Sequence, residues 1–208
     1  MRMLLAAKIL VSYLLGSLSG SLLIGRALGV DIRRAGSGNA GGTNAFRTRG
    51  WRFALGVVII DIGKGALAAW LGLAWGGSPL HGWLCALAAV AGHCWPVFFG
   101  FRGGKGAATL IGAVAVLLPV AVAPLFVVWV LVLTASGYVG LSTVCAGLAF
   151  PLVAWLIAPS DRVLFACAIV AAALIVFMHR ENLARLRAGN EHRFDRARVW
   201  ARWLGRAR

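Results

Sequence analysis

Acidic side chains are scarce in this sequence, with six Asp and Glu against 21 Lys and Arg among 208 residues. Metal-dependent hydrolysis, which needs clustered carboxylates, is therefore not indicated. Neither H-E-x-x-H nor G-x-S-x-G occurs, which argues against zinc-peptidase and serine-hydrolase chemistry. The cysteines lie in apolar runs without C-x-x-C spacing, so we expect small buried side chains and no disulfide framework or metal site. They are Cys85, Cys94, Cys145 and Cys167.

Apolar residues dominate what is present: 61% of the chain is hydrophobic, 13% is charged, and the mean hydropathy is +0.85. Such a composition is typical of a multi-spanning membrane protein. The excess of Lys and Arg would also suit nucleic acid. However, the basic residues flank apolar runs, where the preference of cytoplasmic loops for positive charge explains them. We therefore predict contact with anionic membrane lipids or an anionic substrate, and no nucleic acid.

The pattern of charge and proline predicts an all-α integral membrane protein with seven spans, some short, in a single domain covering residues 1–208. We interpret the first as an uncleaved span with the N-terminus outside, because the loop after it carries six arginines and one acid. The basic tail, residues 179–208, is then cytoplasmic and contributes to the site. The predicted spans are residues 4–25, 53–75, 82–99, 107–118, 123–135, 138–158 and 163–178.

Asp61 and Lys64 are charged residues inside the second predicted span, three positions apart on one helix face. We interpret them as a structural ion pair whose charges cancel in the membrane interior. A role in the functional site is the alternative. The many Gly and Ala residues of the spans indicate close packing between helices.

Polar residues gather in three clusters, all on the predicted cytoplasmic side. The first, residues 36–47, reads G-S-G-N-A-G-G-T-N-A-F-R, and its glycines allow tight turns that offer backbone N–H groups to an anion. A G-x-G-x-x-G match within it lacks the preceding strand of a dinucleotide-binding fold. A flexible basic loop is the alternative interpretation.

The second cluster, residues 92–106, combines G-H-C-W-P with G-F-R-G-G-K-G, so that Lys105 stands between glycines just before a predicted helix. This arrangement favours anion binding, and a lysine that reaches the lipid headgroups is the alternative. The third cluster, residues 179–191, reads H-R-E-N-L-A-R-L-R-A-G-N-E; in a helix, His179 and Asn182 share a face. Beyond about residue 194 the tail, with Trp200 and Trp203, suits binding to anionic lipid.

Together the clusters supply cations, hydroxyls and amides, a set suited to two phosphate groups held side by side at a membrane surface. A small anion transporter or channel is the competing class. Transport sites usually lie near the membrane midplane between repeated halves, whereas these polar residues gather at one face. A lipid phosphotransferase is weaker still, because its usual acidic metal ligands are missing.

The chain resembles the bacterial acyl-phosphate-dependent glycerol-3-phosphate acyltransferases over nearly its whole length. The resemblance rests on G-S-G-N-x-G-x-T-N-x-x-R, on G-H-x-W-P-x-F followed by G-G-K-G, and on H-R-x-N-x-x-R-L-x-x-G-x-E, in this order. It implies acyl transfer from acyl phosphate to glycerol 3-phosphate, giving lysophosphatidic acid and phosphate without metal or cofactor. It also implies the bacterial inner membrane, with the active site facing the cytoplasm.

Carried over by position, the resemblance implies a catalytic set of Ser37, Arg47, Lys105, His179 and Asn182. The substrate-binding residues that it implies are Gly38, Asn39, Gly41, Thr43, Asn44, His93, Gly103, Gly104, Gly106, Arg180 and Glu191. We expect the glycerol hydroxyl to attack the acyl carbonyl directly, while Lys105 and Arg47 neutralise phosphate charge. The proton acceptor stays open between His179 and the phosphate of the donor itself.

Overall fold

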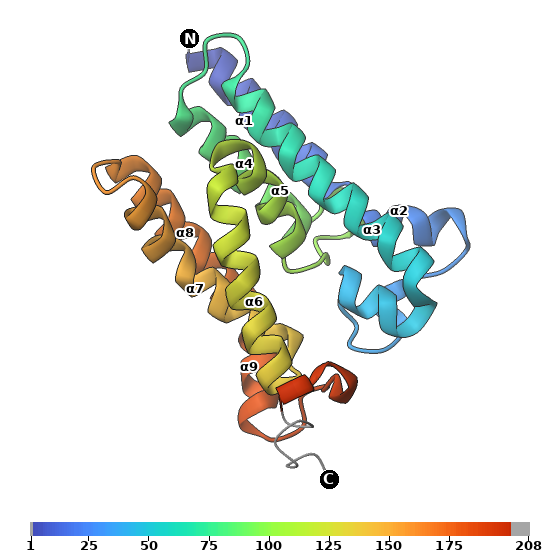
Figure 1. Cartoon of the computed structure of the whole chain (residues 1–208). Helices are drawn as coiled ribbons and strands as arrows, with labels where there is room; N and C mark the ends of the chain where they lie inside the picture. Colours follow the sequence, from blue (N-terminus) through green and yellow to red (C-terminus); the bar gives the residue numbers. More distant parts are fainter. Residues whose placement is uncertain (1, 201–208) are drawn as a thin grey trace. The chain divides into compact units, whose positions relative to one another are not determined.

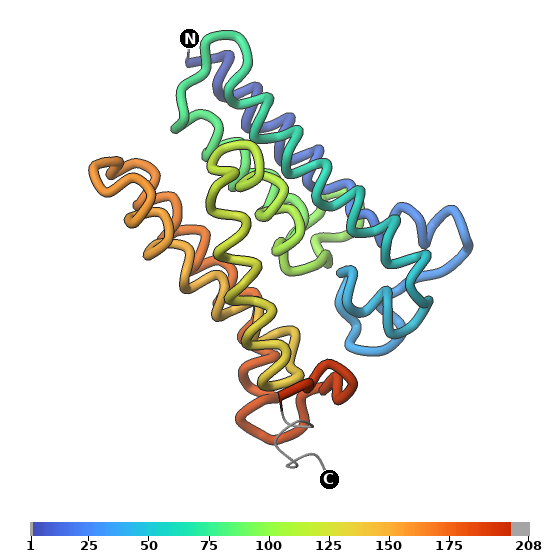
Figure 2. The backbone as a smooth tube through the Cα atoms, in the orientation of Figure 1, coloured from blue at the N-terminus to red at the C-terminus, as the bar shows by residue number. Residues whose placement is uncertain are grey.

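The structure, a computed structural model, describes residues 2–200 of the chain. These residues form helices and no strands, which confirms the predicted all-α class for them. The end of the predicted basic tail, residues 201–208 with Trp203, lies outside the described part. The chain divides into two compact units, Met1–Pro119 and Val120–Arg208, whose courses can be followed in Figures 1 and 2.

The first unit is a bundle in which a bent pair of helices precedes three further helices. In chain order these are α1 (Arg2–Ser17), α2 (Gly20–Ala27), α3 (Gly42–Leu73), α4 (Pro79–Cys94) and α5 (Ala107–Leu117). The axes of α1 and α2 differ by 50°. α1 packs along α3 and α4, and α5 packs against the same two helices (Figure 1). Short 3₁₀ turns, Ile32–Arg34 and Val97–Phe99, lie in the two connections that carry the first and second clusters.

The second unit places α7 in contact with both α6 and α8 (Figures 1 and 2). Its helices are α6 (Val122–Ser136), α7 (Val139–Ile157), α8 (Arg162–Met178) and α9 (Arg180–Arg187). Asp161 begins α8, because its carboxylate accepts a hydrogen bond from the Leu164 amide at 2.9 Å. α8 and α9 meet at 53°, and the third cluster starts at this bend.

By length and composition, four helices of the described chain can cross a membrane, and six can if each bent pair counts as one span. The predicted span 53–75 covers the apolar part of a longer helix, since α3 begins at Gly42. Hydropathy marks only the apolar part of this helix and misses its polar first turns, which end at a non-helical residue, Gly50, with φ 79°. The predicted span 82–99 lies within Pro79–Phe99, a segment long and apolar enough to cross a membrane, in which α4 ends at Cys94 shortly before Pro96.

The cysteines behave largely as the sequence predicts. Cys85, Cys94 and Cys167 are buried, whereas Cys145 is partly buried, and all four are free thiols. They are therefore packing residues of the bundles.

The predicted first span is broken at residues 18–19, and the pair Asp61 and Lys64 lies at this break. The two side chains form an ion pair at 2.9 Å and are buried, which confirms the predicted pairing. Lys64 also donates to the carbonyl oxygens of Gly16 and Leu18, and Asp61 accepts from the Gly20 amide. The cation thus meets the C-terminal end of α1 and the anion meets the N-terminal end of α2, as the helix dipoles favour.

Glycine allows α3 and α5 to pack with their backbones in contact. A Cβ atom at Gly65 would overlap the backbone of Thr109, and one at Gly112 would overlap the backbone of Ile62. This is the close approach that small residues permit between membrane helices.

We expect Gly65→Ala to lower the melting temperature in detergent, because the added methyl group forces α5 away from α3 at a cost of about 1–3 kcal/mol. Gly63→Ala is the matched control, since a Cβ atom there meets nothing within 4 Å. Scanning fluorimetry of the two variants measures the difference. Equal melting temperatures would contradict backbone contact at this helix crossing.

Candidate active site

The first cluster is a loop closed onto the start of α3 by one side chain, Asn44. Its amide group donates to the carbonyl oxygens of Ile32, Ala35 and Asn39 at 3.0–3.1 Å. Its carbonyl oxygen accepts from the Ser37 amide at 2.9 Å. Asn44 is only 1% exposed, so its polar atoms hold the loop and are not available to a substrate unless the loop opens.

The loop leads into the N-terminal end of α3. Since α3 begins at Gly42, the amides of its first turn have no partner within the helix. Gly36 and Gly38 have φ values of 60° and 72°, which glycine adopts without strain, and they turn the chain toward this helix end. Thr43 and Arg47, predicted to lie in a loop, are therefore on the first turns of a helix. The N-terminal end of a helix attracts anions.

The second cluster folds back onto the end of α4. The amides of Gly103 and Gly104 donate to the carbonyl oxygens of Cys94 and His93 at 3.2 and 3.1 Å. Side chains are excluded at both glycines, because a Cβ atom would overlap the His93 backbone oxygen in one case and the His93 ring in the other. Lys105 follows in a partly buried position, and Gly106, with φ 82°, is the N-cap residue just before α5.

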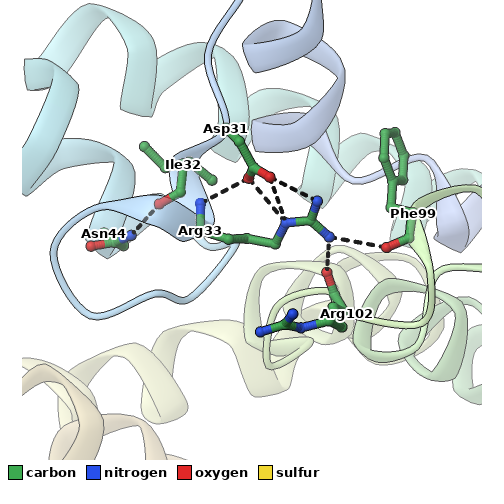
Figure 3. A network of polar contacts seen from close by, with 6 residues as sticks. All are labelled: Asp31, Ile32, Arg33, Asn44, Phe99 and Arg102. Carbon is green, nitrogen blue, oxygen red and sulfur yellow. Dashed lines mark hydrogen bonds and ion pairs between the residues drawn. The ribbon is translucent and has the colours of Figure 1, made fainter.

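Arg33, which sequence reasoning did not single out, connects the first two clusters. Its guanidinium donates to the carbonyl oxygens of Phe99 and Arg102, each at 3.0 Å, and pairs with Asp31 at 2.9 Å (Figure 3). Gly104 lies beside the Ala40 carbonyl: a Cβ atom at residue 104 would be 3.0 Å from that oxygen. The first two clusters therefore meet within the first unit.

Asp31 keeps Arg33 in this orientation. The hydrogen bond from the Arg33 side chain lowers the pKa of Asp31 from 3.8 to about 2, and the pKa of Arg33 is raised mainly by the same bond. Because the pKa of the folded carboxylate is depressed, its stabilising contribution is complete above about pH 4 and disappears as the pH falls through about 2. The sequence contained a signal for this pair, because Asp31 is the acid of an arginine-rich loop and stands two residues before Arg33.

The third cluster is organised within the second unit around Glu191. This carboxylate accepts from the Asn182 amide group and from the Arg185 guanidinium, each at 2.7 Å. Gly140 of α7 packs against the Asn182 side chain, and a Cβ atom would come within 2.8 Å of it. Glu191 was predicted to bind substrate, and in the structure its carboxylate anchors Asn182 and Arg185.

His179 is at the bend between α8 and α9 and is 5% exposed. Its Nδ1 atom lies 2.8 Å from the Ile175 carbonyl oxygen, which can only accept a hydrogen bond. Nδ1 therefore carries the proton, and in the neutral ring Nε2 is the acceptor. Arg180 instead turns back to donate to the Phe177 carbonyl and covers the Phe177 ring.

His93, predicted to bind substrate, is 3% exposed and faces Asp61 and Lys64 rather than an open surface. The structure thus brings the first and second clusters into contact through Arg33 and at Gly104, and it joins Asn182 to Glu191 in the third cluster.

We expect Arg33→Ala to increase hydrogen–deuterium exchange at the amides of Phe101, Gly103 and Gly104 by about tenfold or more, since hydrogen bonds to a charged group contribute about 1.5–3 kcal/mol. Arg34→Ala, which removes the same charge from an exposed neighbour, is the control and leaves exchange there unchanged. Similar exchange in both variants would contradict the role of Arg33 as a connection between the two loops.

Comparison with known proteins agrees with this arrangement. The family model described as glycerol-3-phosphate acyltransferase matches residues 6–189. Glycerol-3-phosphate acyltransferase 2 of Moorella thermoacetica is 44% identical over 187 residues, which are 89% of this chain and 95% of that protein. The glycerol-3-phosphate acyltransferase of Aquifex aeolicus is 39% identical over 189 residues, 89% of this chain and 97% of its own.

Solved structures give the same result. The crystal structure of PlsY, an integral membrane glycerol 3-phosphate acyltransferase, in its glycerol 3-phosphate form is 38% identical, with a TM-score of 0.86 over 91% of this chain and 95% of that one. Its lysophosphatidic acid form is 37% identical, with a TM-score of 0.83 and the same coverage. This chain belongs to the glycerol-3-phosphate acyltransferase family.

Proposed function

We propose that this chain transfers an acyl group from acyl phosphate to glycerol 3-phosphate, releasing lysophosphatidic acid and inorganic phosphate as the first step of phospholipid synthesis. Family membership supports the acceptor, since the PlsY structures were obtained in glycerol 3-phosphate and lysophosphatidic acid forms. The observation that supports the proposal is the meeting of two glycine-rich polar segments, joined by Arg33, within one unit. A family of this kind leaves no ground for the transporter alternative.

The two loops suit the two phosphate groups of this reaction. We assign the phosphate of glycerol 3-phosphate to the glycine-framed Lys105, and the phosphate of the acyl donor to the N-terminal end of α3 with Ser37 and Arg47. Held side by side, the glycerol hydroxyl and the acyl carbonyl react without a covalent enzyme intermediate, because acyl phosphate is already activated. The hydroxyl oxygen bonds to the acyl carbon, the bond from that carbon to the phosphate oxygen breaks, and phosphate leaves with both electrons.

We assign the hydroxyl proton to His179. Its Nδ1 atom lies 2.8 Å from the Ile175 carbonyl oxygen, which orients the ring at the bend between α8 and α9. Asn182, anchored by Glu191, would assist in the same reaction on the basis of the third motif. The remaining substrate-binding assignments, from Gly38 to Gly106 and at Arg180, rest on the resemblance.

We further propose seven spans, an external N-terminus, a cytoplasmic site in the bacterial inner membrane, and a basic tail that binds anionic lipid. A helix overlaps each of the seven predicted segments. α5 has 11 residues and thus spans about 16 Å, against a hydrocarbon core of about 30 Å. Its packing against α3 and α4 supplies the cover that a short membrane helix needs.

The reaction is tested with purified protein in lipid, glycerol 3-phosphate, and either palmitoyl phosphate or palmitoyl-CoA. We expect lysophosphatidic acid and phosphate in equal amounts from palmitoyl phosphate alone. Lys105→Ala should abolish turnover, whereas Arg49→Ala, at an exposed position of α3, should not. Product from palmitoyl-CoA would contradict acyl phosphate as the donor. Product from Lys105→Ala would contradict the assignment of Lys105 to the site.

His179→Gln tests the proton acceptor separately. General-base catalysis contributes at least about 100-fold, so we expect kcat to fall by that factor while KM changes little. Activity within about threefold of the parent protein would assign the proton to the donor phosphate instead.

A further inference from the structure

A buried group of three polar side chains lies between the α1–α2 break and the second cluster. Asp61 and Lys64 come from α3, and His93 comes from the last turn of α4. His93 Nδ1 lies 2.8 Å from Lys64 Nζ and 3.4 Å from Asp61 Oδ1. All three residues are at most 5% exposed, so this network is inside the first unit.

Two partners on the Nδ1 side hold the ring of His93 in place. A lysine ammonium group has three hydrogens and no acceptor. Lys64 Nζ faces the carbonyl oxygens of Gly16 and Leu18, the Asp61 carboxylate and His93 Nδ1. Toward Lys64, Nδ1 can only accept, and toward Asp61 Oδ1 at 3.4 Å it can only donate, so these two partners set the ring orientation in either tautomer.

The other edge of the His93 ring forms the floor beneath Gly104. A Cβ atom at Gly104 would overlap Nε2 of this ring. The His93 backbone oxygen also accepts from the Gly104 amide at 3.1 Å. One residue thus contacts the glycine loop through both its ring and its backbone, and Lys64 determines where the ring stands.

We propose that Lys64, held by Asp61, positions His93 so that the loop 103–106 keeps the conformation that binds the phosphate of glycerol 3-phosphate. These are positioning residues, since they act through the loop. The proposal rests on the proposed function and adds three residues to it, one of which, His93, was expected to touch substrate itself.

A second buried lysine, Lys8, provides a control for the alternative that Lys64 only donates to the backbone carbonyls at helix ends. Lys8 of α1 is also 5% exposed and also donates to a backbone carbonyl, that of Ala74 just beyond the end of α3. Its Nζ atom lies 5.6 Å from the centre of the Trp75 ring. Lys8 thus resembles Lys64 in burial and backbone bonding, but it contacts Ala74 and Trp75 of the α3–α4 connection, which is not part of the second cluster.

The test compares Lys64→Met with Lys8→Met in the full-length protein. We expect both changes to lower the melting temperature. Only Lys64→Met should raise KM for glycerol 3-phosphate, by about tenfold or more, with KM for palmitoyl phosphate within about twofold, because the His93 ring beneath Gly104 then loses its Lys64 partner. Calorimetric titration with glycerol 3-phosphate alone should show the same loss of affinity.

Substitutions of His93 keep the test usable if Lys64→Met does not fold, since they leave the ion pair in place. His93→Ala removes both the Nδ1 acceptor and the ring beneath Gly104. His93→Asn retains an acceptor for Lys64 and should recover part of the affinity for glycerol 3-phosphate. In the double variant, the rise in KM for glycerol 3-phosphate should be much smaller than the sum, in free energy, of the effects of Lys64→Met and His93→Ala alone.

The outcomes separate this proposal from the proposed function. Absence of acyl transfer by the unmodified protein would overturn the function. With an active parent protein, a KM for glycerol 3-phosphate that is unchanged in Lys64→Met and His93→Ala would overturn the positioning role. The same holds if Lys8→Met raises that KM equally, because the effect would then follow general destabilisation.

Discussion

Much of the first unit depends on the ion pair between Asp61 and Lys64. A helix broken inside a membrane exposes amide and carbonyl groups that lipid cannot satisfy, each at a cost of several kcal/mol. Here Lys64 satisfies carbonyls at the end of α1 and Asp61 satisfies the first amide of α2. The break is therefore stable only while both charges are present, and each charge is tolerated in the interior only because of the other.

The break lies close to the second cluster because the same helices also contact the segment that follows α4. Tyr13 of α1 donates to the Trp95 carbonyl at 2.8 Å, and the Val97 amide donates to the Ser17 hydroxyl at 3.4 Å. Gly92 approaches the Tyr13 carbonyl so closely that a Cβ atom would overlap it. The end of α1 and the end of α4 are thus one packed junction, from which the glycine loop 103–106 emerges.

The sequence was sufficient for the features that depend on local composition. Apolar run length predicted the helices, and the spacing of Asp61 and Lys64 predicted their pairing. The sequence was insufficient for features that depend on tertiary contacts. Nothing in hydropathy shows that α3 begins at Gly42, because its first turns are polar and are stabilised by Asn44 bonding to distant carbonyls. Nor could one sequence show that His93 turns toward Lys64, since the two are 29 residues apart on different helices.

Several polar residues in or beside the clusters form hydrogen bonds with the protein itself. Arg33, Asn44 and Glu191 all belong to the polar clusters or lie beside them, yet each is occupied by protein partners that shape a loop. A guanidinium that already donates to a carboxylate and two carbonyls has few hydrogens left for phosphate. In such a site, one set of polar groups defines the backbone conformation, and a second set can then meet the substrates without first being ordered. Preorganisation of this kind is what a reaction between two bound phosphate compounds requires, since its rate depends on holding hydroxyl and carbonyl at attack distance.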